Sequence, residues 1–164
     1  MQYPNATPDE VKRAQAPHNI LISGVFLFNL LMTPAILALK IGMVGLFIPL
    51  LCSGALIAYI YRRSRKTSSW FVDMHWRIAF SRSKLLMLGY AISATLIFLA
   101  WLISLTTKDA NMSHIIWTAL TRVALMPTVV LVLVTAVMEF SSYAQAGKRE
   151  VPDKLAAKFP PPAA

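Results

Sequence analysis

The stretch YRRSRKTSSWFVDMHWRIAFSRSK, residues 61–84, separates two strongly apolar halves of the chain and decides how the fold is built. It holds seven of the sixteen Lys and Arg residues, a single acid, Asp73, and two of the four tryptophans. Basic residues beside apolar runs are typical of cytoplasmic loops in membrane proteins, where anionic lipid headgroups supply the counter-charge. The stretch therefore predicts a cytoplasmic anchor between membrane-spanning segments.

The composition of the whole chain also indicates a membrane protein. Of its 164 residues, 57% are hydrophobic and only 14% are charged, with a mean hydropathy of +0.58. Soluble domains are less apolar and more charged than this. The net charge of +9 arises from bases beside apolar runs, so we expect anionic lipid headgroups as partners and no nucleic acid. Cys52 is the only cysteine, which excludes an intrachain disulfide.

Four apolar runs are long enough to cross a bilayer. The first two, 20–39 and 41–61, are separated only by Lys40, and one helix through both would be roughly twice as long as the hydrocarbon core is thick. The chain must therefore turn there. The sequence predicts an all-α, polytopic membrane protein with four transmembrane helices, arranged as two hairpins joined by an interfacial amphipathic segment. The predicted regions are a cytoplasmic N-terminal segment with a short helix (1–19), hairpin 1 (20–61), a basic aromatic cytoplasmic or interfacial loop (62–84), hairpin 2 (85–140) and a cytoplasmic Pro-containing tail (141–164).

The polar ends of the chain carry their own local signals. Thr7 and Glu10 have the spacing of a helix capping box, and Pro8 suits a first helical turn. We expect a short helix from Pro8 to about Gln15 that ends before Pro17. The charged, Pro-containing tail predicts an extended or disordered segment unless a partner orders it.

The distribution of bases predicts the orientation. With four spans, both termini and the central loop share one side, which carries thirteen of the sixteen bases, whereas Lys40 and Lys108 lie on the other side. Cytoplasmic loops are the ones enriched in Lys and Arg, the positive-inside rule. We therefore expect a multi-pass protein of the cell inner (cytoplasmic) membrane, with both termini cytoplasmic.

Small residues at helical spacing mark the faces through which the helices would pack. Lipid gives helices no hydrophobic reason to associate, so close approach through small residues holds such faces together. These stripes either pack within a four-helix bundle or dock a partner subunit. Their principal members are Gly42 and Gly45 in the second span, Gly89 and Ser93 in the third, and Thr128 and Thr135 in the fourth.

Two intramembrane polar residues are candidates for function. Asn29, one turn from Thr33, suits an interhelical hydrogen bond or a ligand contact. Arg122 is the one charge inside an apolar run. Its side chain could extend to the nearby interface or pair with Asp109, bind a partner carboxylate or lipid phosphate, or serve transport. Pro34, Pro49 and Pro127 lie near the middle of three spans and predict kinks.

The 62–84 loop has two apolar faces as well as its bases. One face suits the membrane interface, and the second predicts a docking surface, because one membrane surface covers only one face. The residues expected to contact lipid or a partner are Arg62, Arg63, Arg65, Lys66, Trp70, Trp76, Arg82 and Lys84.

The sequence offers no catalytic motif. Within the apolar runs there is no Asp or Glu, which counts against a proton-coupled antiporter. His18 and His75 share a side and could meet, but two histidines without a cysteine or an acidic cluster predict interfacial residues better than a metal site. Glu139, at the cytoplasmic end of the fourth span, is expected to be solvated. We therefore expect no enzyme activity, catalytic residue, metal or cofactor.

These observations favour a non-catalytic accessory, scaffold or assembly subunit, docked onto other membrane protein subunits of a larger inner-membrane complex such as a respiratory one. The alternative is a small oligomeric transporter or lipid-handling membrane protein, for which Asn29, Arg122 and the prolines inside the spans would serve.

Overall fold

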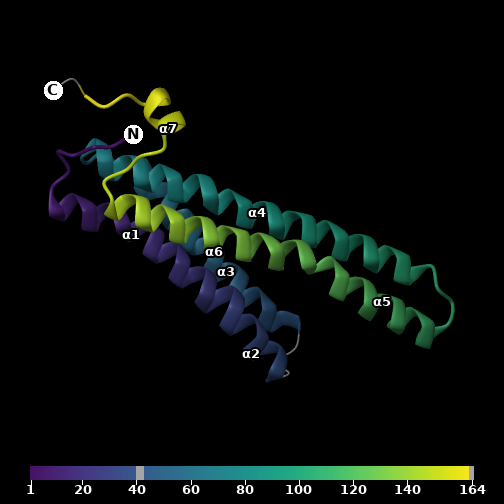
Figure 1. The fold of residues 1–164 in the computed structure, drawn as a ribbon. Helices are drawn as coiled ribbons and strands as arrows, with labels where there is room; N and C mark the ends of the chain where they lie inside the picture. Colours follow the sequence, from purple (N-terminus) through teal and green to yellow (C-terminus); the bar gives the residue numbers. More distant parts are fainter. Residues whose placement is uncertain (40–42, 163–164) are drawn as a thin grey trace. The chain divides into compact units, whose positions relative to one another are not determined.

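The computed structural model describes residues 1–39 and 43–162, which are almost entirely helical (Figure 1). Apart from one isolated bridge between Gln2 and Glu150, these residues form no β-structure. The elements in chain order are α1 (Pro8–Gly24), the π-helix η1 (Val25–Met32), α2 (Thr33–Ala38), the 3-10 helix η2 (Met43–Leu46), α3 (Phe47–Ser64), α4 (Trp70–Leu105), α5 (Ala110–Ala124), α6 (Met126–Gly147) and α7 (Asp153–Lys158). The predicted turn at Lys40 lies outside the described residues.

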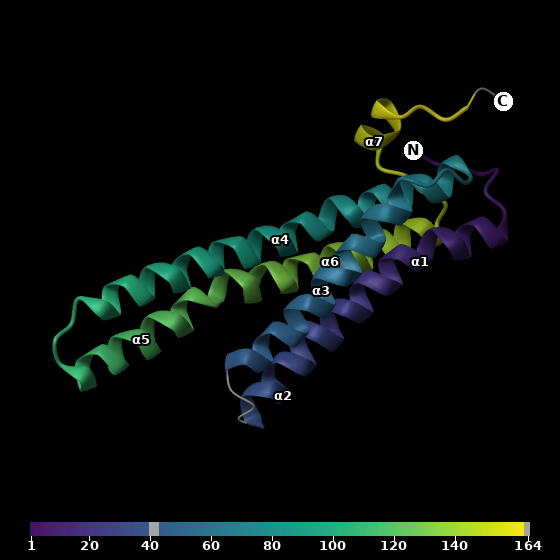
Figure 2. The ribbon, with the colours of Figure 1, turned by 180° about the vertical axis from the view of Figure 1, so that it is seen from behind.

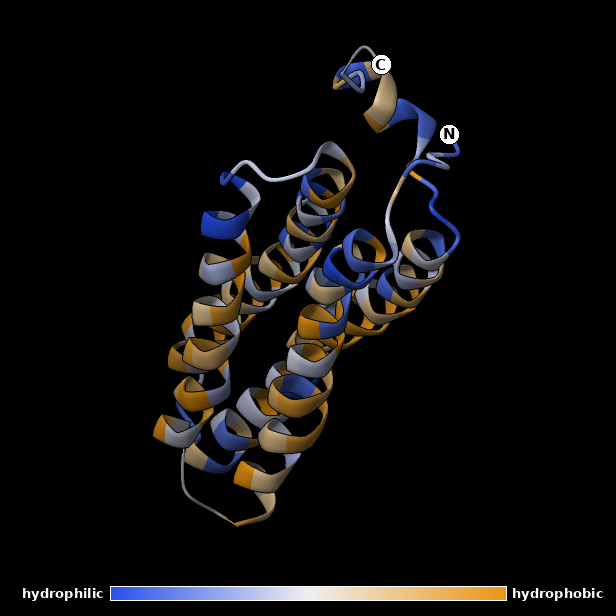
Figure 3. Ribbon diagram, turned by 90° about the vertical axis from the view of Figure 1, so that its left-hand side faces the viewer, coloured by the Kyte–Doolittle hydropathy of each residue, from blue (hydrophilic) through white to orange (hydrophobic). Residues whose placement is uncertain are grey.

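Four helical stretches are long and apolar enough to cross a membrane: Pro8–Ile36, Val44–Ser64, Trp70–Leu105 and Ala110–Gly147. Most of their side chains face outward, and many of the exposed ones are large and apolar (Figure 3). Lipid is the solvent that suits such a surface, and a helix satisfies its own backbone polar groups there. By length and composition the protein is a multi-pass, all-helical membrane protein, as the sequence predicted.

The chain divides into two compact units, and α4 and α6 each contribute to both. Unit 1 contains Met1–Ser83 and Ala136–Ala164, and unit 2 contains Lys84–Thr135. Unit 1 includes the first two predicted spans, the basic aromatic segment and both chain ends. Unit 2 includes most of the third span and the first part of the fourth.

In unit 1, α1 begins where the sequence predicted. The Thr7 side chain accepts a hydrogen bond from the Glu10 N–H, and the Glu10 carboxylate accepts one from the Thr7 N–H. The predicted end before Pro17 is wrong, because α1 continues to Gly24. Pro17 removes one backbone hydrogen bond, but it is fully buried, so its packing outweighs that loss.

The helix changes its winding before Pro34. Residues Val25–Met32 form the π-helix η1, and the Thr33 hydroxyl donates to the Phe28 carbonyl at 2.9 Å. Proline lacks an N–H and crowds the carbonyl four residues earlier. A wider turn ahead of it relieves this clash, and π-turns are a known source of helix distortion. The distortion expected at Pro34 thus takes the form of a π-helix.

The first turns of α4 are packed inside unit 1. Phe71 is fully buried and stacks on Tyr3, with ring centroids 5.9 Å apart. Trp76 is only 5% exposed, and it is covered by the Tyr59 ring and by the guanidinium of Arg63. The chain itself therefore occupies apolar surface that the sequence assigned to lipid or a partner.

The same α4 helix continues into the third predicted span without a break. It has 36 residues, which gives a length of about 54 Å against a hydrocarbon core of roughly 30 Å. Part of α4 must therefore lie outside the hydrocarbon, and its basic first turns are the part suited to headgroups and water. Where the sequence separated residues 70–84 from the span, the structure has one continuous helix.

The two chain ends pair with each other in unit 1 (Figures 1 and 2). Val151 donates its N–H to the Met1 carbonyl, and Tyr3 donates its N–H to the Arg149 carbonyl. The tail continues into α7 and reaches α4, where the Trp70 indole N–H donates to the Phe159 carbonyl at 2.8 Å. We call residues 1–6 with 148–159 the terminal cap. The tail, expected to be extended or disordered without a partner, is ordered by the chain's own N-terminus and α4.

Unit 2 contains the later part of α4, all of α5 and the first part of α6. Asp109 caps α5, because its carboxylate accepts hydrogen bonds from the N–H groups of Asn111 and Met112. α5 ends at Ala124 and α6 begins at Met126. The break lies next to Pro127, which has no N–H to continue the helical ladder. At the kink predicted here, the one turn residue Leu125 separates α5 from α6, and backbone hydrogen bonds from Leu125 to Thr121 and from Val129 to Leu125 continue across it.

Candidate functional site

The basic and aromatic residues expected to contact lipid or a partner have different environments. Trp76 is buried, and Arg63, Trp70 and Arg82 are partly covered by the chain. The exposed members, which still suit headgroup contact, are Arg62, Arg65, Lys66 and Lys84. Arg65 also lies over the Tyr61 ring, 4.6 Å from its centroid.

The two intramembrane polar residues lie in different units. Asn29, within η1, donates to the Ser53 hydroxyl of α3 at 3.4 Å, an interhelical hydrogen bond of the expected kind. Arg122 is in the last turn of α5 and is exposed. The pairing with Asp109 is absent, because that carboxylate caps the start of α5 instead.

The small residues predicted to mark packing faces meet in unit 2. Ser93 accepts hydrogen bonds from both the N–H and the hydroxyl of Thr128, at 3.3 and 2.8 Å. A Cβ on Gly89 would lie 3.3 Å from the Thr128 Cα and from the Leu131 Cβ, so α4 and α6 are in close contact here. Ser93 thus satisfies a backbone N–H beside the helix break. Of the remaining members, Thr135 and Gly45 are buried and Gly42 lies outside the described residues.

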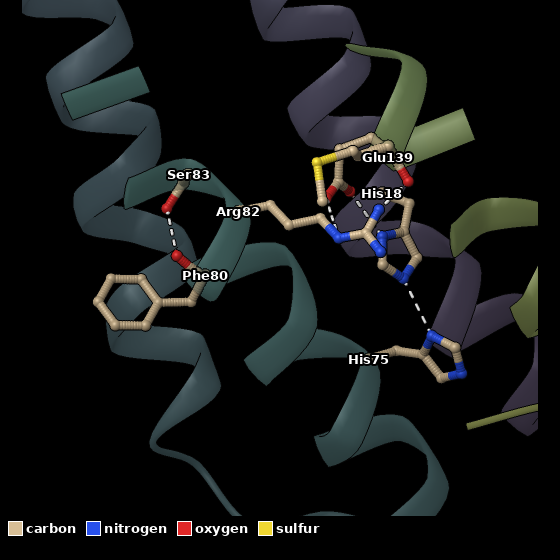
Figure 4. A network of polar contacts seen from close by, with 7 residues as sticks. His18, His75, Phe80, Arg82, Ser83 and Glu139 are labelled. Atoms are coloured by element: carbon tan, nitrogen blue, oxygen red, sulfur yellow. Dashed lines mark hydrogen bonds and ion pairs between the residues drawn. The ribbon is translucent and has the colours of Figure 1, made fainter. Parts of the chain in front are cut away.

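A buried ionisable cluster in unit 1 brings together three elements (Figure 4). His18 comes from α1, His75 and Arg82 from α4, and Glu139 from α6. His18 Nδ1 lies 2.6 Å from Glu139 Oε2, and His18 Nε2 lies 3.0 Å from His75 Nδ1. His18, His75 and Glu139 are all 0% exposed. We call these three residues with Arg82 the histidine–glutamate cluster.

Arg82 supplies the positive charge of this cluster. Its Nε lies 3.9 Å from Glu139 Oε1, and its guanidinium donates to the Met138 carbonyl. A buried carboxylate without compensation is strongly unfavourable. Here the compensation comes from a cation on α4 and an imidazole on α1, so the charge of Glu139 holds three helices together.

Local sequence places the members on facing surfaces. His75 and Arg82 are seven residues, or about two turns, apart on α4, and therefore share one helix face. On α6, Thr135 and Ser142 lie one turn on either side of Glu139, and all three are fully buried. The buried side of α6 thus carries a stripe of three polar side chains, beside buried apolar ones such as Ala136.

Two outer atoms of the cluster lack hydrogen bonds. Among the described residues, Glu139 Oε1 and His75 Nε2 are buried without a hydrogen-bond partner, although Glu139 Oε1 has the ion pair with Arg82. The backbone of Glu150, in the terminal cap, is the group that interacts with His75 from that side. The cluster therefore has one satisfied centre, His18, and two polar ends that can still accept or donate.

The sequence only partly indicated this site. That His18 and His75 could meet was foreseen, but Glu139 was expected to be solvated, and the structure shows it fully buried. The available signal was the spacing of Thr135, Glu139 and Ser142, which puts a carboxylate on a stripe of small polar residues. As to metals, within the described ranges no three His, Cys, Asp or Glu side chains are grouped as ligands.

Comparison of the chain with known protein families, with characterised proteins and with solved structures gives no match.

Proposed function

We propose that the protein is a non-catalytic accessory or assembly subunit that docks onto a larger inner-membrane complex, such as a respiratory complex. The observation that carries this proposal is the exposed Arg122, a cation within the apolar run 115–138 of the fourth candidate span. A cation facing lipid is unfavourable, at about 3 kcal/mol near the centre of a bilayer. A carboxylate on a neighbouring membrane helix would remove that cost.

The surroundings of Arg122 support docking through unit 2. Arg122 lies about 10 Å along the helix from the apolar start at Ile115. The acid nearest in sequence, Asp109, is engaged as a helix cap. Large apolar side chains are exposed in the same unit, including the neighbouring rings of Phe98 and Trp101. Exposed aromatic side chains and arginine are the residue types that are enriched at the anchoring centres of protein interfaces.

The orientation is part of the same proposal. Thirteen bases on the side of both termini favour a cytoplasmic location for the terminal cap and for the first turns of α4. The exposed bases Arg62, Arg65 and Lys66 then face anionic headgroups. Unit 2 would present Arg122 to a partner from within the membrane.

The experiment is purification of the full-length tagged protein from its native membrane in a mild detergent. A photo-crosslinking residue at the exposed position Ala119, one turn before Arg122, should capture one membrane protein. Arg122→Ala should abolish that crosslink and the co-purification, whereas Arg122→Lys should keep both. Lys108→Ala, in the polar turn, is the matched control and should leave them unchanged.

Two results would contradict the proposal. Recovery of the chain as a lone monomer would show that it has no stable partner. An unchanged crosslink in Arg122→Ala would show that the cation is not needed for docking. Recovery only as a complex of identical copies would favour the alternative, a small oligomeric transporter or lipid-handling protein.

A further inference from the structure

We propose that His18, His75 and Glu139 form a proton-binding relay, which takes up one proton and passes it between a buried histidine and a buried carboxylate. This site goes beyond the accessory role above and does not depend on it. The observation that carries it is a pair of consecutive hydrogen bonds through the single imidazole ring of His18 (Figure 4).

The geometry couples the two hydrogen bonds. A neutral imidazole donates from one nitrogen and accepts at the other. If His18 donates from Nδ1 to the Glu139 carboxylate, its Nε2 must accept from the Nδ1–H of His75. If Glu139 is protonated and donates to His18 Nδ1, then His18 Nε2 donates to His75. Either direction satisfies both contacts, at 2.6 and 3.0 Å.

Conversion between the two states takes up one proton and leaves no other product. A proton binds to His75 Nε2, and the Nδ1 proton of His75 moves to His18 Nε2. The Nδ1 proton of His18 moves to Glu139 Oε2. Both rings are neutral before and after, and each has changed from the Nδ1–H to the Nε2–H tautomer. The Glu139 carboxylate has become a neutral carboxylic acid. Chains of Asp, Glu and His within membrane proteins are the usual form of a proton relay.

The two ends of the relay fit this role better than that of a static ion pair. An ion pair of Glu139 and His18 would need no second buried histidine, yet His75 is 0% exposed. Its Nε2 is buried and lacks a well-formed hydrogen bond among the described residues, and the backbone of Glu150 interacts with this ring. After transfer, Nε2 carries a hydrogen that can be donated in that direction.

The charged groups that face the relay set what protonation does. His18 faces it from α1, His75 and Arg82 from α4, and Glu139 from α6. When Glu139 is ionised, the guanidinium of Arg82 attracts it across the 3.9 Å between Nε and Oε1. Protonation of Glu139 removes that attraction, so the contact between α4 and α6 weakens when the proton arrives.

The first experiment uses the full-length protein in lipid nanodiscs, with ¹⁵N-labelled histidine. As the pH falls, the ring-nitrogen signals of His18 and His75 should exchange between Nδ1–H and Nε2–H forms together. An infrared band of a protonated carboxyl should appear over the same pH range and be missing in Glu139→Gln. His114 is exposed and lies outside the cluster, so it serves as an internal control whose ring signals should not follow the coupled tautomer change.

The second experiment separates relay from packing. After a rapid pH drop, the carboxyl band should form about a hundredfold more slowly in His75→Gln, the lower range of what a positioned proton-transfer group contributes. His114→Gln should react like the unaltered protein. If Glu139→Gln or His75→Gln fails to fold, the relay is tested by whether His18 and His75 change tautomer together in the unaltered protein.

Three results would overturn the relay. The first is that both histidines gain a second proton while the carboxyl band never appears. The second is that neither ring changes tautomer over the pH range in which the protein stays folded. The third is a stoichiometric metal ion in the purified protein whose removal shifts the His18 and His75 signals, because a bound metal would occupy the nitrogens that carry the proton.

Discussion

Glu139 has a different environment in the structure from the one its position in the sequence indicates. By sequence it is an acid just beyond an apolar run, for which solvation is the simplest expectation. In the structure it is fully buried beside His18 and Arg82. A charge in that position stabilises the fold only while both neighbours remain, because a buried charge that loses its partner is left uncompensated.

Replacement of His18 by Gln should therefore destabilise the protein by about 3 kcal/mol, because it removes the imidazole that hydrogen-bonds a buried carboxylate and leaves a charged acceptor poorly satisfied. Unfolding of the purified protein by denaturant in mixed micelles would measure this change. His114→Gln, at an exposed position, should change the free energy of unfolding very little. Equal effects of the two substitutions would show that the buried pair adds no stability.

Ser93 offers a second test, on the other unit. Ser93→Ala removes the acceptor of two hydrogen bonds from Thr128 and should cost about 1 kcal/mol, since polar contacts between membrane helices are individually weak. Thr95→Ala is the control on the same helix, because that exposed hydroxyl bonds only to the Ala91 carbonyl of its own helix. The same unfolding measurement applies. A loss in Thr95→Ala as large as that in Ser93→Ala would contradict the assignment.

The helices accommodate their prolines in three ways. Pro17 is absorbed inside α1, Pro34 follows the π-helix η1, and Pro127 lies where α5 ends and α6 begins. All three lack the same N–H. What differs is the compensation available: full burial for Pro17, the Thr33 hydroxyl before Pro34, and Ser93 beside Pro127.

Pro34→Ala should convert η1 towards a regular α-helix. Residue 34 would regain an N–H, and the clash with the carbonyl four residues earlier would disappear. Hydrogen–deuterium exchange should slow over residues 30–36, because the backbone hydrogen bond of residue 34 is restored. The hydrogen bond from Asn29 to Ser53 should weaken, because a change in winding rotates Asn29 on the helix. Unaltered exchange in this region would show that the π-helix does not depend on Pro34.

The terminal cap joins the two ends of the chain to the start of α4. The ring of Phe159 lies 4.1 Å from the Arg77 guanidinium, and its carbonyl accepts from Trp70. Phe159→Ala keeps the carbonyl but removes a cation–π contact worth about 1 kcal/mol. Trypsin should then cleave after Lys154 and Lys158 faster. Pro160→Ala, at an exposed neighbouring position, should leave the cleavage rate unchanged. Equal cleavage rates for both variants would show that the Phe159 ring does not hold the terminal cap against α4.

The proposed orientation can be tested with single cysteines, because Cys52 is the only native one. In a Cys52→Ser background, Lys108→Cys should react with an impermeant maleimide added to intact spheroplasts. Lys66→Cys should react only after the membrane is permeabilised, if the side with the most bases is cytoplasmic. The reverse pattern would place both termini outside.

The number of candidate spans, the helical class and the start of α1 could be predicted without the structure, because they depend on hydrophobic length and on hydrogen bonds between near neighbours. The sequence also indicated the small residues that meet in unit 2, since helical spacing alone puts Gly89 and Ser93 on one face. Such features need no knowledge of which helices are adjacent.

What covers residues 61–84, and where Glu139 lies, depends on contacts between segments that are distant in the sequence. The aromatic faces of that segment are filled by Tyr3 and Tyr59, and the partner of Glu139 is 121 residues away in the chain. Periodicity shows that a face is apolar or polar, but not what occupies it. Only the folded arrangement brings His18, His75 and Glu139 within hydrogen-bond distance, because contacts between distant segments leave no periodic signal in a single sequence.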